Sequence, residues 1–378
     1  MSFKRLLLVT ISTLLSLSLL GACTNNEDGD KVDETPMTRE ELIAAAQAEG
    51  KVIVYSTTSR ISKAAEEFTK IYGIVVEASN LKDGELIEKV SREVSGDIVG
   101  ADFVLAQDSG RVYGQLINTG YLVNYVPESM KDVIPAHYQQ PLHFQMVNKV
   151  FTFNSEKTQV PVIKNVWELT EPQWKGLVQF KDPNQEGVNF NFLTMITSEE
   201  WADKLAQSYK NLYGKDIELT EENAGYEWIK RFFDNDVVLG NSDTTISENI
   251  GIKGQANTTL GLFVYSKTRF DAAKNLALQP MTEVEPFSGF YYPIFAQMTK
   301  NAKNPNAAKL FIEYLLTEEG FEPWSSDVGS YSGNPNIAVN EGDHPISFWE
   351  ERLVPEDPEF IYKNRAKIEE FVNRVINN

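Results

Sequence analysis

Residues 51–80 read KVIVYSTTSRISKAAEEFTKIYGIVVEASN, and this stretch decides the class of fold. Residues 51–55 are a short apolar run of the kind that forms a buried strand, and residues 74–77 are a second one. Between them, apolar side chains recur at helical spacing, at Ile61, Ala64, Ala65, Phe68 and Ile71. A strand, a helix and another strand joined by short turns predict a parallel βαβ unit.

The same alternation continues on the C-terminal side of this unit. Residues 85–94 are an amphipathic helix, and residues 103–106 are a third strand that ends before Asp108. A second set of α/β patterns follows His143, with strands expected at 150–154, 176–180, 260–265 and 289–295 and helices at 220–235 and 304–318. We therefore expect an α/β fold with two bodies, because a chain of this size usually builds more than one core.

Composition excludes several classes of protein. The chain has 378 residues, 42% apolar and 24% charged, and its 54 acidic and 35 basic residues give a formal charge of −19. Sequence-neutral binding to nucleic acid depends on clusters of lysine and arginine, so no nucleic-acid partner is expected. Because there is a single cysteine, neither an intrachain disulfide nor a cysteine-built zinc site can form.

The N-terminus carries the pattern of a secretory signal. Lys4 and Arg5 precede an apolar run over 6–20, which is shorter than the roughly 20 residues that span a bilayer. The run ends in Leu-Gly-Ala-Cys, which resembles a bacterial lipobox with Cys23 as the lipidated residue. We expect a signal peptide over 1–22 and an anchor of acyl chains such as palmitate, which would hold the protein at the extracytoplasmic face of the cell membrane. The alternative is an uncleaved anchor in which Cys23 has no role.

A polar segment separates this signal from the globular sequence. Residues 24–36, TNNEDGDKVDETP, contain five acids and one lysine and offer almost nothing to bury. We therefore predict a solvated tether over 23–37, with the folded body beginning near Thr38.

Four further segments resemble a known family. They are residues 51–56 (KVIVYS), residues 153–157 (FNSEK) with VWEL at 166–169 and WKG at 174–176, Asp182-Pro183, and residues 304–316 (NPNAAKLFIEYLL). Together they resemble the solute-binding lipoproteins of ABC importers, in the group that includes ferric-ion, thiamine and organophosphate binders.

This resemblance implies a two-lobed, type 2 periplasmic-binding-protein-like fold. Two crossover strands, near 143–151 and 287–295, would join a first lobe of residues 38–145 with 294–378 to a second lobe of residues 146–293. The expected role is to capture a small solute between the lobes and deliver it to the permease and its ATPase. The resemblance implies a monomer that needs no cofactor and is not an enzyme.

The candidate ligand residues come from the ends of strands. In open α/β sheets a ligand lies beyond the carboxyl ends of the strands, where helix N-termini can hold an oxyanion. In this sequence those positions are 56–60, 108–109, the loop over 182–191, and 265–267. Arg60 could also pair with an anion through both arms of its guanidinium, or it could lie on a solvated helix end. The hydroxyls before this helix could bind ligand or only cap the helix. The ten candidates are Ser56, Thr57, Thr58, Arg60, Asp108, Ser109, Asn191, Tyr265, Tyr291 and Tyr292.

The identity of the ligand has three alternatives. Ferric iron, free or chelated, is the first; Tyr265 and Tyr292 are its candidate ligands because the metal favours phenolate oxygen. The ferric-binding relatives have two consecutive tyrosines at the position of Tyr265, where this chain continues with Ser266. The second alternative is a phosphorylated or anionic organic solute such as a sugar phosphate or phosphonate, and the third is a surface lipoprotein with no transport role.

Enzyme motifs are incomplete in this sequence. Residues 79–82 (SNLK) fit SxxK, but no SDN or KTG motif follows, and there is no GxSxG, Walker or GxGxxG sequence. The three histidines match no HExxH pattern, so the residues predict no catalytic role.

Overall fold

The computed structural model describes residues 37–377, and the elements discussed below lie in one compact unit that starts at Arg39. The predicted signal peptide, Cys23 and nearly all of the predicted tether lie outside the described residues. Within residues 37–377, no helix combines the length and apolar character needed to cross a bilayer.

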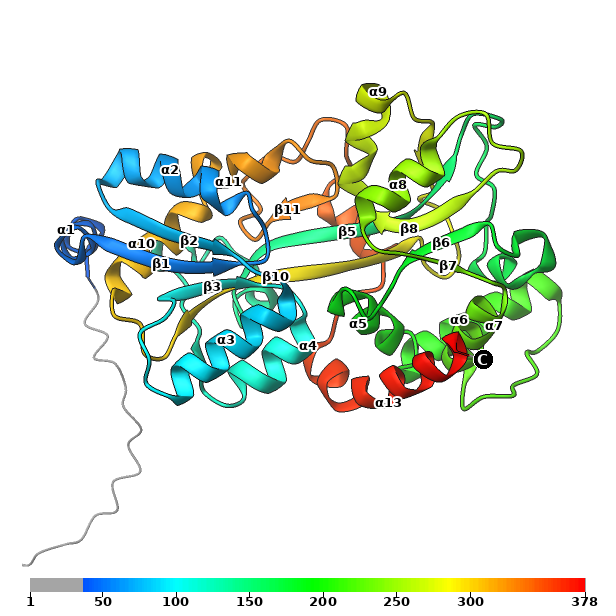
Figure 1. The fold of residues 1–378 in the computed structure, drawn as a ribbon, viewed down its shortest axis with the longest axis horizontal. Coiled ribbons are helices and arrows are strands. Elements are labelled where there is room, and N and C mark those ends of the chain that lie inside the picture. The colour runs from blue at the N-terminus through cyan, green and yellow to red at the C-terminus, as the bar shows by residue number, and fades with distance from the viewer. Residues whose placement is uncertain (1–36, 378) are drawn as a thin grey trace, which may run out of the picture. The chain divides into compact units, whose positions relative to one another are not determined.

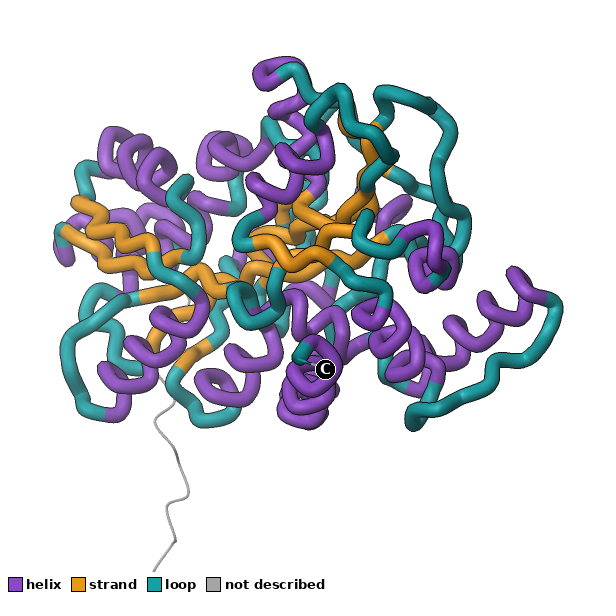
Figure 2. Tube along the Cα trace, turned by 45° about the vertical axis from the view of Figure 1, so that its right-hand side comes forward, coloured by secondary structure: helices purple, strands orange, loops and turns teal. Residues whose placement is uncertain are grey.

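A mixed β-sheet runs through the fold with helices on both of its faces (Figures 1 and 2). Its strand order is β2-β1-β3-β10-β5-β8-β6-β7. β1 pairs in parallel with both β2 and β3, as the βαβ pattern predicts. These elements, which we call the first lobe, are β1 (Lys51–Ser56), α2 (Ile61–Tyr72), β2 (Val75–Asn80), α3 (Asp83–Ser95) and β3 (Phe103–Ala106).

Two long strands carry the sheet from the first lobe to the second. β5 (His143–Asn154) and β10 (Gly289–Thr299) pair antiparallel, from Gly289 opposite Val150 to Phe295 opposite His143. β10 also pairs with β3, and β5 pairs with β8 (Leu260–Val264). This arrangement confirms the two predicted crossover strands.

The second lobe continues the sheet with parallel strands and covers it with helices. β6 pairs in parallel with both β7 and β8. The other elements of this lobe are β6 (Val178–Lys181), α5 (Gly187–Met195), α6 (Glu199–Tyr213), α7 (Ala224–Asp234), β7 (Val238–Gly240), α8 (Asp243–Gly251), α9 (Phe270–Lys274) and β9 (Leu278–Pro280). Trp167 and Trp228 are fully buried beneath these helices.

The C-terminal part of the chain returns to the first lobe and then contacts both lobes. α10 packs on α1 (Arg39–Glu49), and α11 packs on α2. The expected helix over 304–318 is two helices, because Thr317 caps α11 by accepting a hydrogen bond from the Gly320 N–H. These elements are α10 (Pro305–Leu315), α11 (Glu318–Ser325), β11 (Ser330–Ser332), α12 (Ile346–Glu350) and α13 (Pro358–Ile376).

The last helix bears on the predicted lobe boundaries. α13 packs against α5 and α7 of the second lobe and also against α4 (Ser109–Arg111), which follows β3 (Figure 1). It therefore lies across elements of both lobes, although residues 294–378 are expected in the first. The lobe boundaries remain a prediction. Short segments complete the fold: Val112–Ile117, Leu122–Val123, Glu128–Met130, Ala136–Tyr138, Val166–Thr170, Pro172–Trp174 and Tyr265–Arg269.

Candidate functional site

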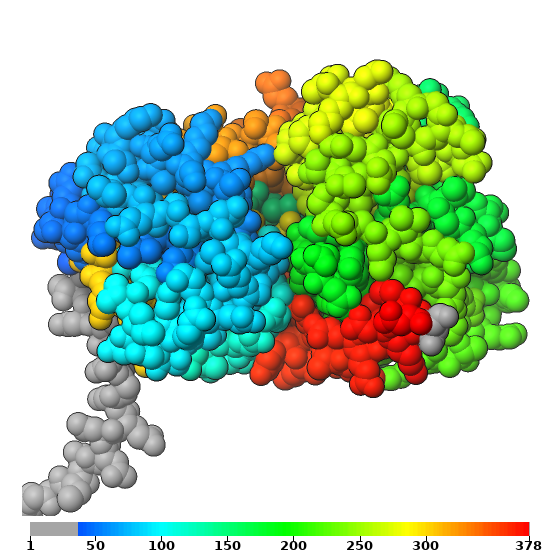
Figure 3. Space-filling view, viewed as in Figure 1, coloured from blue at the N-terminus to red at the C-terminus, as the bar shows by residue number. Residues whose placement is uncertain are grey.

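A cavity of about 380 Å³ lies between the two lobes, where the space-filling view shows a recess (Figure 3). Its floor comes from the crossover strands, through Gln145, Val147, Tyr292 and Ile294. The first lobe contributes the loop after β1, and the second contributes groups at the ends of β6 and β8. The remaining wall comes from residues 324–330. The cavity thus lies beyond the carboxyl ends of parallel strands, as the topology predicts.

The loop after β1 offers hydroxyl groups to the cavity. Ser56 is fully buried and holds the turn, because its Oγ accepts a hydrogen bond from the Thr58 N–H at 3.1 Å. Thr57, Thr58, Ser59 and Arg60 line the cavity. The Thr57 Oγ1 is buried and has no hydrogen-bond partner among the described residues. No side chain caps α2 at Arg60.

Three basic side chains face the cavity: Arg60, Lys267 and Arg269. The two arginines share the buried carboxylate of Asp327, at 2.5 Å from Arg60 and 3.4 Å from Arg269. The Lys267 ammonium forms no hydrogen bond or ion pair with any described residue, and it lies 5.8 Å from the centroid of the Phe270 ring. Burial, and then the nearby Arg269, lower the pKa of the Lys267 ammonium. An anion bound beside Lys267 would counteract both effects, because an opposite charge stabilises the protonated ammonium and raises its pKa.

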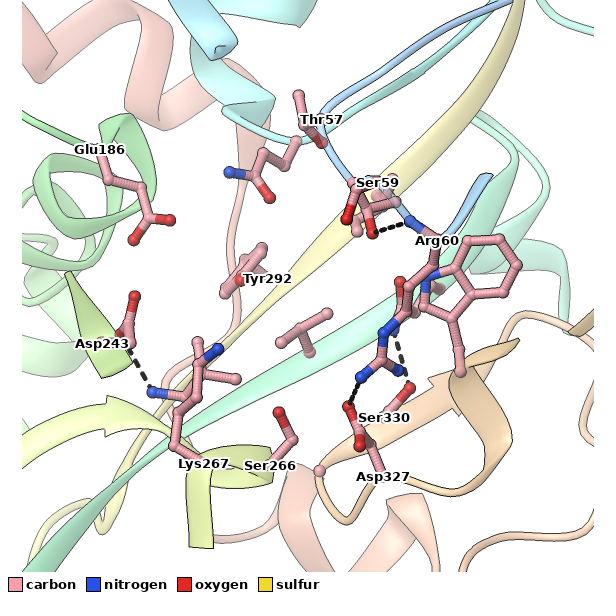
Figure 4. Close-up of a pocket in the computed structure, with 18 of the residues that line it drawn as sticks. Thr57, Ser59, Arg60, Glu186, Asp243, Ser266, Lys267, Tyr292, Asp327 and Ser330 are labelled. Carbon is pink, nitrogen blue, oxygen red and sulfur yellow. Dashed lines mark hydrogen bonds and ion pairs between the residues drawn. The ribbon is translucent and has the colours of Figure 1, made fainter. Parts of the chain in front are cut away.

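Two carboxylates, those of Glu186 and Asp243, lie at the opposite side of the cavity (Figure 4), and two lysines behind them neutralise their charge. Lys181 Nζ lies 2.9 Å from Glu186 and 3.0 Å from Asp243, and the fully buried Lys149 pairs with the same two acids. Although burial opposes it, the ammonium groups of Lys149 and Lys181 hold the pKa of Asp243 below its ordinary value. These four groups, the lysine–carboxylate cluster, carry no net charge.

The three candidate tyrosines occupy different environments. Tyr292 lines the cavity, and burial, followed by the charges of Glu186 and Asp243, raises its pKa well above the ordinary value. Tyr265 instead packs its ring on Trp349, with ring centroids 5.4 Å apart, and does not line the cavity. Tyr291 also lies outside the lining, and its backbone N–H bonds to the Val354 carbonyl. Of the described residues, no group of three His, Cys, Asp or Glu side chains is arranged to hold a metal ion.

Asp108, Ser109 and Asn191 lie together beneath the C-terminal segment rather than on the cavity. Arg365 of α13 donates to the carboxylate of Asp108 and, at 3.0 Å, to Asn191 Oδ1. Ser109 Oγ donates to Glu356 at 2.5 Å. We call these five groups the C-terminal cluster. Glu356 and Arg365, which lie more than 160 residues further along the chain than the other three, connect the end of β3 to α5.

Several groups on the cavity were not among the sequence candidates. The chemically important ones are Glu186, Asp243, Lys267, Arg269 and Asp327. Lys267 and Glu186 lie in the segments 265–267 and 182–191 that the strand-end rule marks, although neither was chosen as a candidate, and Arg269 lies two residues beyond the first of these segments. Asp327 follows α11 and no strand, so no local pattern marks it.

Comparison with known proteins places the chain in a family. The profile described as "Bacterial extracellular solute-binding protein" matches residues 63–350. An uncharacterized protein of Haemophilus influenzae is 25% identical over 297 residues, which cover 74% of this chain and 76% of that protein.

Two solved structures with the same fold contain different bound ligands. Iron-bound HitA from Pseudomonas aeruginosa aligns with a TM-score of 0.65 and 15% identity over 86% of this chain and 99% of its own. AfuA from Actinobacillus pleuropneumoniae, with fructose-6-phosphate bound, aligns with a TM-score of 0.62 and 18% identity over 87% of this chain and 98% of its own. At these identities the likeness shows the two-lobed fold alone. With a family match over most of its length, the chain belongs to the bacterial extracellular solute-binding proteins of ABC importers.

Proposed function

We propose that the protein captures a small organic phosphate or a similar dianion in the cavity and delivers it to an ABC permease and its ATPase. The observation that carries this proposal is the charge of the lining. Three cations, Arg60, Lys267 and Arg269, face one carboxylate, Asp327, while the lysine–carboxylate cluster is neutral. Two positive charges are therefore left over in a chain whose formal charge is −19.

The uncharged part of the lining also suits an organic phosphate. A phosphate monoester carries a charge of about −1.5 to −2 at neutral pH and has several strong acceptor oxygens. Hydroxyls of Thr57, Ser59, Ser266 and Ser330 also line the cavity. The volume of about 380 Å³ lies in the range typical of small-molecule sites.

Ferric iron, the first expectation from the sequence, has less support from the lining. Tyr292 is the single candidate tyrosine on the cavity, and the nearby carboxylates of Glu186 and Asp243 are already bound by two lysines. Iron-bound HitA and AfuA with fructose-6-phosphate share the fold, so the fold is compatible with both kinds of ligand. We take the charge of this chain's own cavity as the better guide.

A ligand panel tests the proposal on protein purified without refolding. Native mass spectrometry would weigh any trapped solute, and thermal unfolding would then be followed with sugar phosphates, phosphonates, inorganic phosphate, thiamine and ferric citrate. A ligand at 100 times its Kd stabilises the folded state by about 2.7 kcal/mol. We expect this stabilisation from a phosphate ester. Stabilisation by ferric citrate alone would favour iron, and no stabilisation by any compound would favour the non-transport alternative.

We also propose that Cys23 anchors the protein to the outer face of the membrane by lipidation. Cys23→Ala should move the protein from the detergent-extracted membrane fraction to the soluble fraction, because the stable two-chain anchor is lost. Its melting temperature should not change, since the folded body begins near Thr38. Thr24→Ala, one residue away, is the matched control and should remain membrane-bound. A Cys23→Ala protein that still requires detergent would contradict the proposal.

A further inference from the structure

Asp327 places a carboxylate between two arginines that belong to different lobes. Its Oδ2 lies 2.5 Å from the Arg60 guanidinium and 3.4 Å from that of Arg269, and the residue is 6% exposed. Figure 4 shows Asp327 joined to Arg60 at one side of the cavity. We call these three residues the Asp327 bridge.

The contact with Arg60 lies within the first lobe. Arg60 immediately precedes α2, and Asp327 follows α11, which packs on α2. Arg60 also donates to the Pro323 carbonyl of α11 at 2.9 Å. Asp327 and Arg60 should therefore move together when the lobes open.

The contact with Arg269 crosses between the lobes. Arg269 belongs to the turn Tyr265–Arg269 that follows β8, and this turn packs on β5 and α8. Its guanidinium is held in place by the Ser266 carbonyl at 2.6 Å and the Ser266 Oγ at 2.9 Å. If the lobes separate, the contact between Arg269 and Asp327 should lengthen, while Arg60 keeps its bond to Pro323 and Arg269 keeps its bonds to Ser266.

We propose that Asp327 is a built-in counter-anion, which holds the lobes together when the cavity contains no solute and is replaced on Arg60 and Arg269 by the solute's anionic group. Without Asp327 the two guanidinium groups would repel each other across the cavity, so the ligand-free protein would open. The same carboxylate competes with a bound anion for the two guanidinium groups and lowers its affinity. The second effect rests on the proposed function, whereas the first does not.

The first test needs no ligand. Small-angle scattering would compare the parent with Asp327→Asn in phosphate-free buffer of low ionic strength, because salt screens partly exposed pairs. We expect a larger radius of gyration for Asp327→Asn. Arg269→Gln should increase the radius of gyration in the same way. Because the Arg269 side chain is 36% exposed, this variant still tests the bridge if Asp327→Asn fails to fold. Glu322→Gln is the matched control. It removes one negative charge from α11, at an exposed pair with Lys63, and should leave the radius of gyration unchanged.

The second test measures the affinity of inorganic phosphate by calorimetry. Asp327→Asn should bind about tenfold more tightly, because one repelling charge is removed, whereas Arg269→Gln should bind more weakly. An unchanged radius of gyration in both Asp327→Asn and Arg269→Gln would overturn the bridge, whatever the protein binds. Expansion with weaker phosphate binding by Asp327→Asn would overturn its role as a competitor. If the parent binds no anion at all, the proposed function fails while the scattering result still stands.

Discussion

Replacing Lys267 with methionine should lower the affinity for a phosphate monoester by about 10- to 150-fold, which corresponds to about 1.5–3 kcal/mol for a lost hydrogen bond to a charged group. Lys267 faces the cavity and forms no ion pair with any described residue. Its ammonium is therefore free to bind the solute, whereas Arg60 and Arg269 must first release Asp327. Methionine retains most of the length of the side chain and removes its charge.

Titration calorimetry with the best phosphate ester from the panel would measure this loss. Lys274→Met is the matched control, because Lys274 lies on α9 in an exposed pair with Glu248 and the net charge changes equally. Tyr292→Phe separates the two ligand classes, since it should abolish the colour of a ferric–phenolate complex and change phosphate binding little. A Lys267→Met protein with parental phosphate affinity would show that the cationic side of the cavity is not the ligand site.

Much of the fold could be predicted because it is encoded locally. Apolar residues recur at helical spacing in α2 and form continuous runs in the strands beside it and in the two crossover strands. Each of these patterns involves only residues close together in the chain. No helix was predicted for α6, α8 or α13, and the helix over 304–318 was predicted as one element. Thr317 ends its first part by capping α11, and a capping side chain changes the chain direction without interrupting the apolar pattern.

The site could be predicted only where strand ends determine it. Thr57, Thr58 and Arg60 line the cavity because they follow β1 directly. Asp108 also follows a strand, but α13 lies over it and Arg365 forms an ion pair with its carboxylate. That contact joins residues 257 apart in the chain. Neither periodicity nor composition carries information about such a partner.

The C-terminal cluster leads to a prediction about pH. Burial of Glu356, and then the negative charge of Asp108, raise the pKa of its carboxyl group to about 8, against the hydrogen bond from Ser109 and the charge of Arg365. Because this pKa lies above the value of 4.5 for an ordinary glutamate, the folded protein holds the proton more tightly than the unfolded chain. The resulting stabilisation is complete below about pH 4.5 and is lost as the pH rises through about 8.

We therefore expect the free energy of unfolding to fall between about pH 5 and pH 8, by an amount on the order of a few kcal/mol, since each unit of pKa shift corresponds to about 1.4 kcal/mol. Asp83 should add to the same slope, because burial, with Asp108 and Glu186, raises its pKa to about 7. Urea unfolding at constant ionic strength across this range would measure the slope.

Glu356→Gln should flatten that slope and make the protein more stable than the parent at pH 8, because a neutral amide replaces a carboxylate that burial disfavours. Glu359→Gln is the matched control: it lies three residues away at the exposed start of α13, paired with Lys363, and should keep the parental slope. Adding Asp83→Asn should remove the remaining dependence of the unfolding free energy on pH between pH 5 and pH 8. If Glu356→Gln and the parent lose stability equally between pH 5 and pH 8, Glu356 is already ionised in the folded protein. In that case Arg365 must compensate two carboxylates, those of Asp108 and Glu356, where α13 joins the lobes.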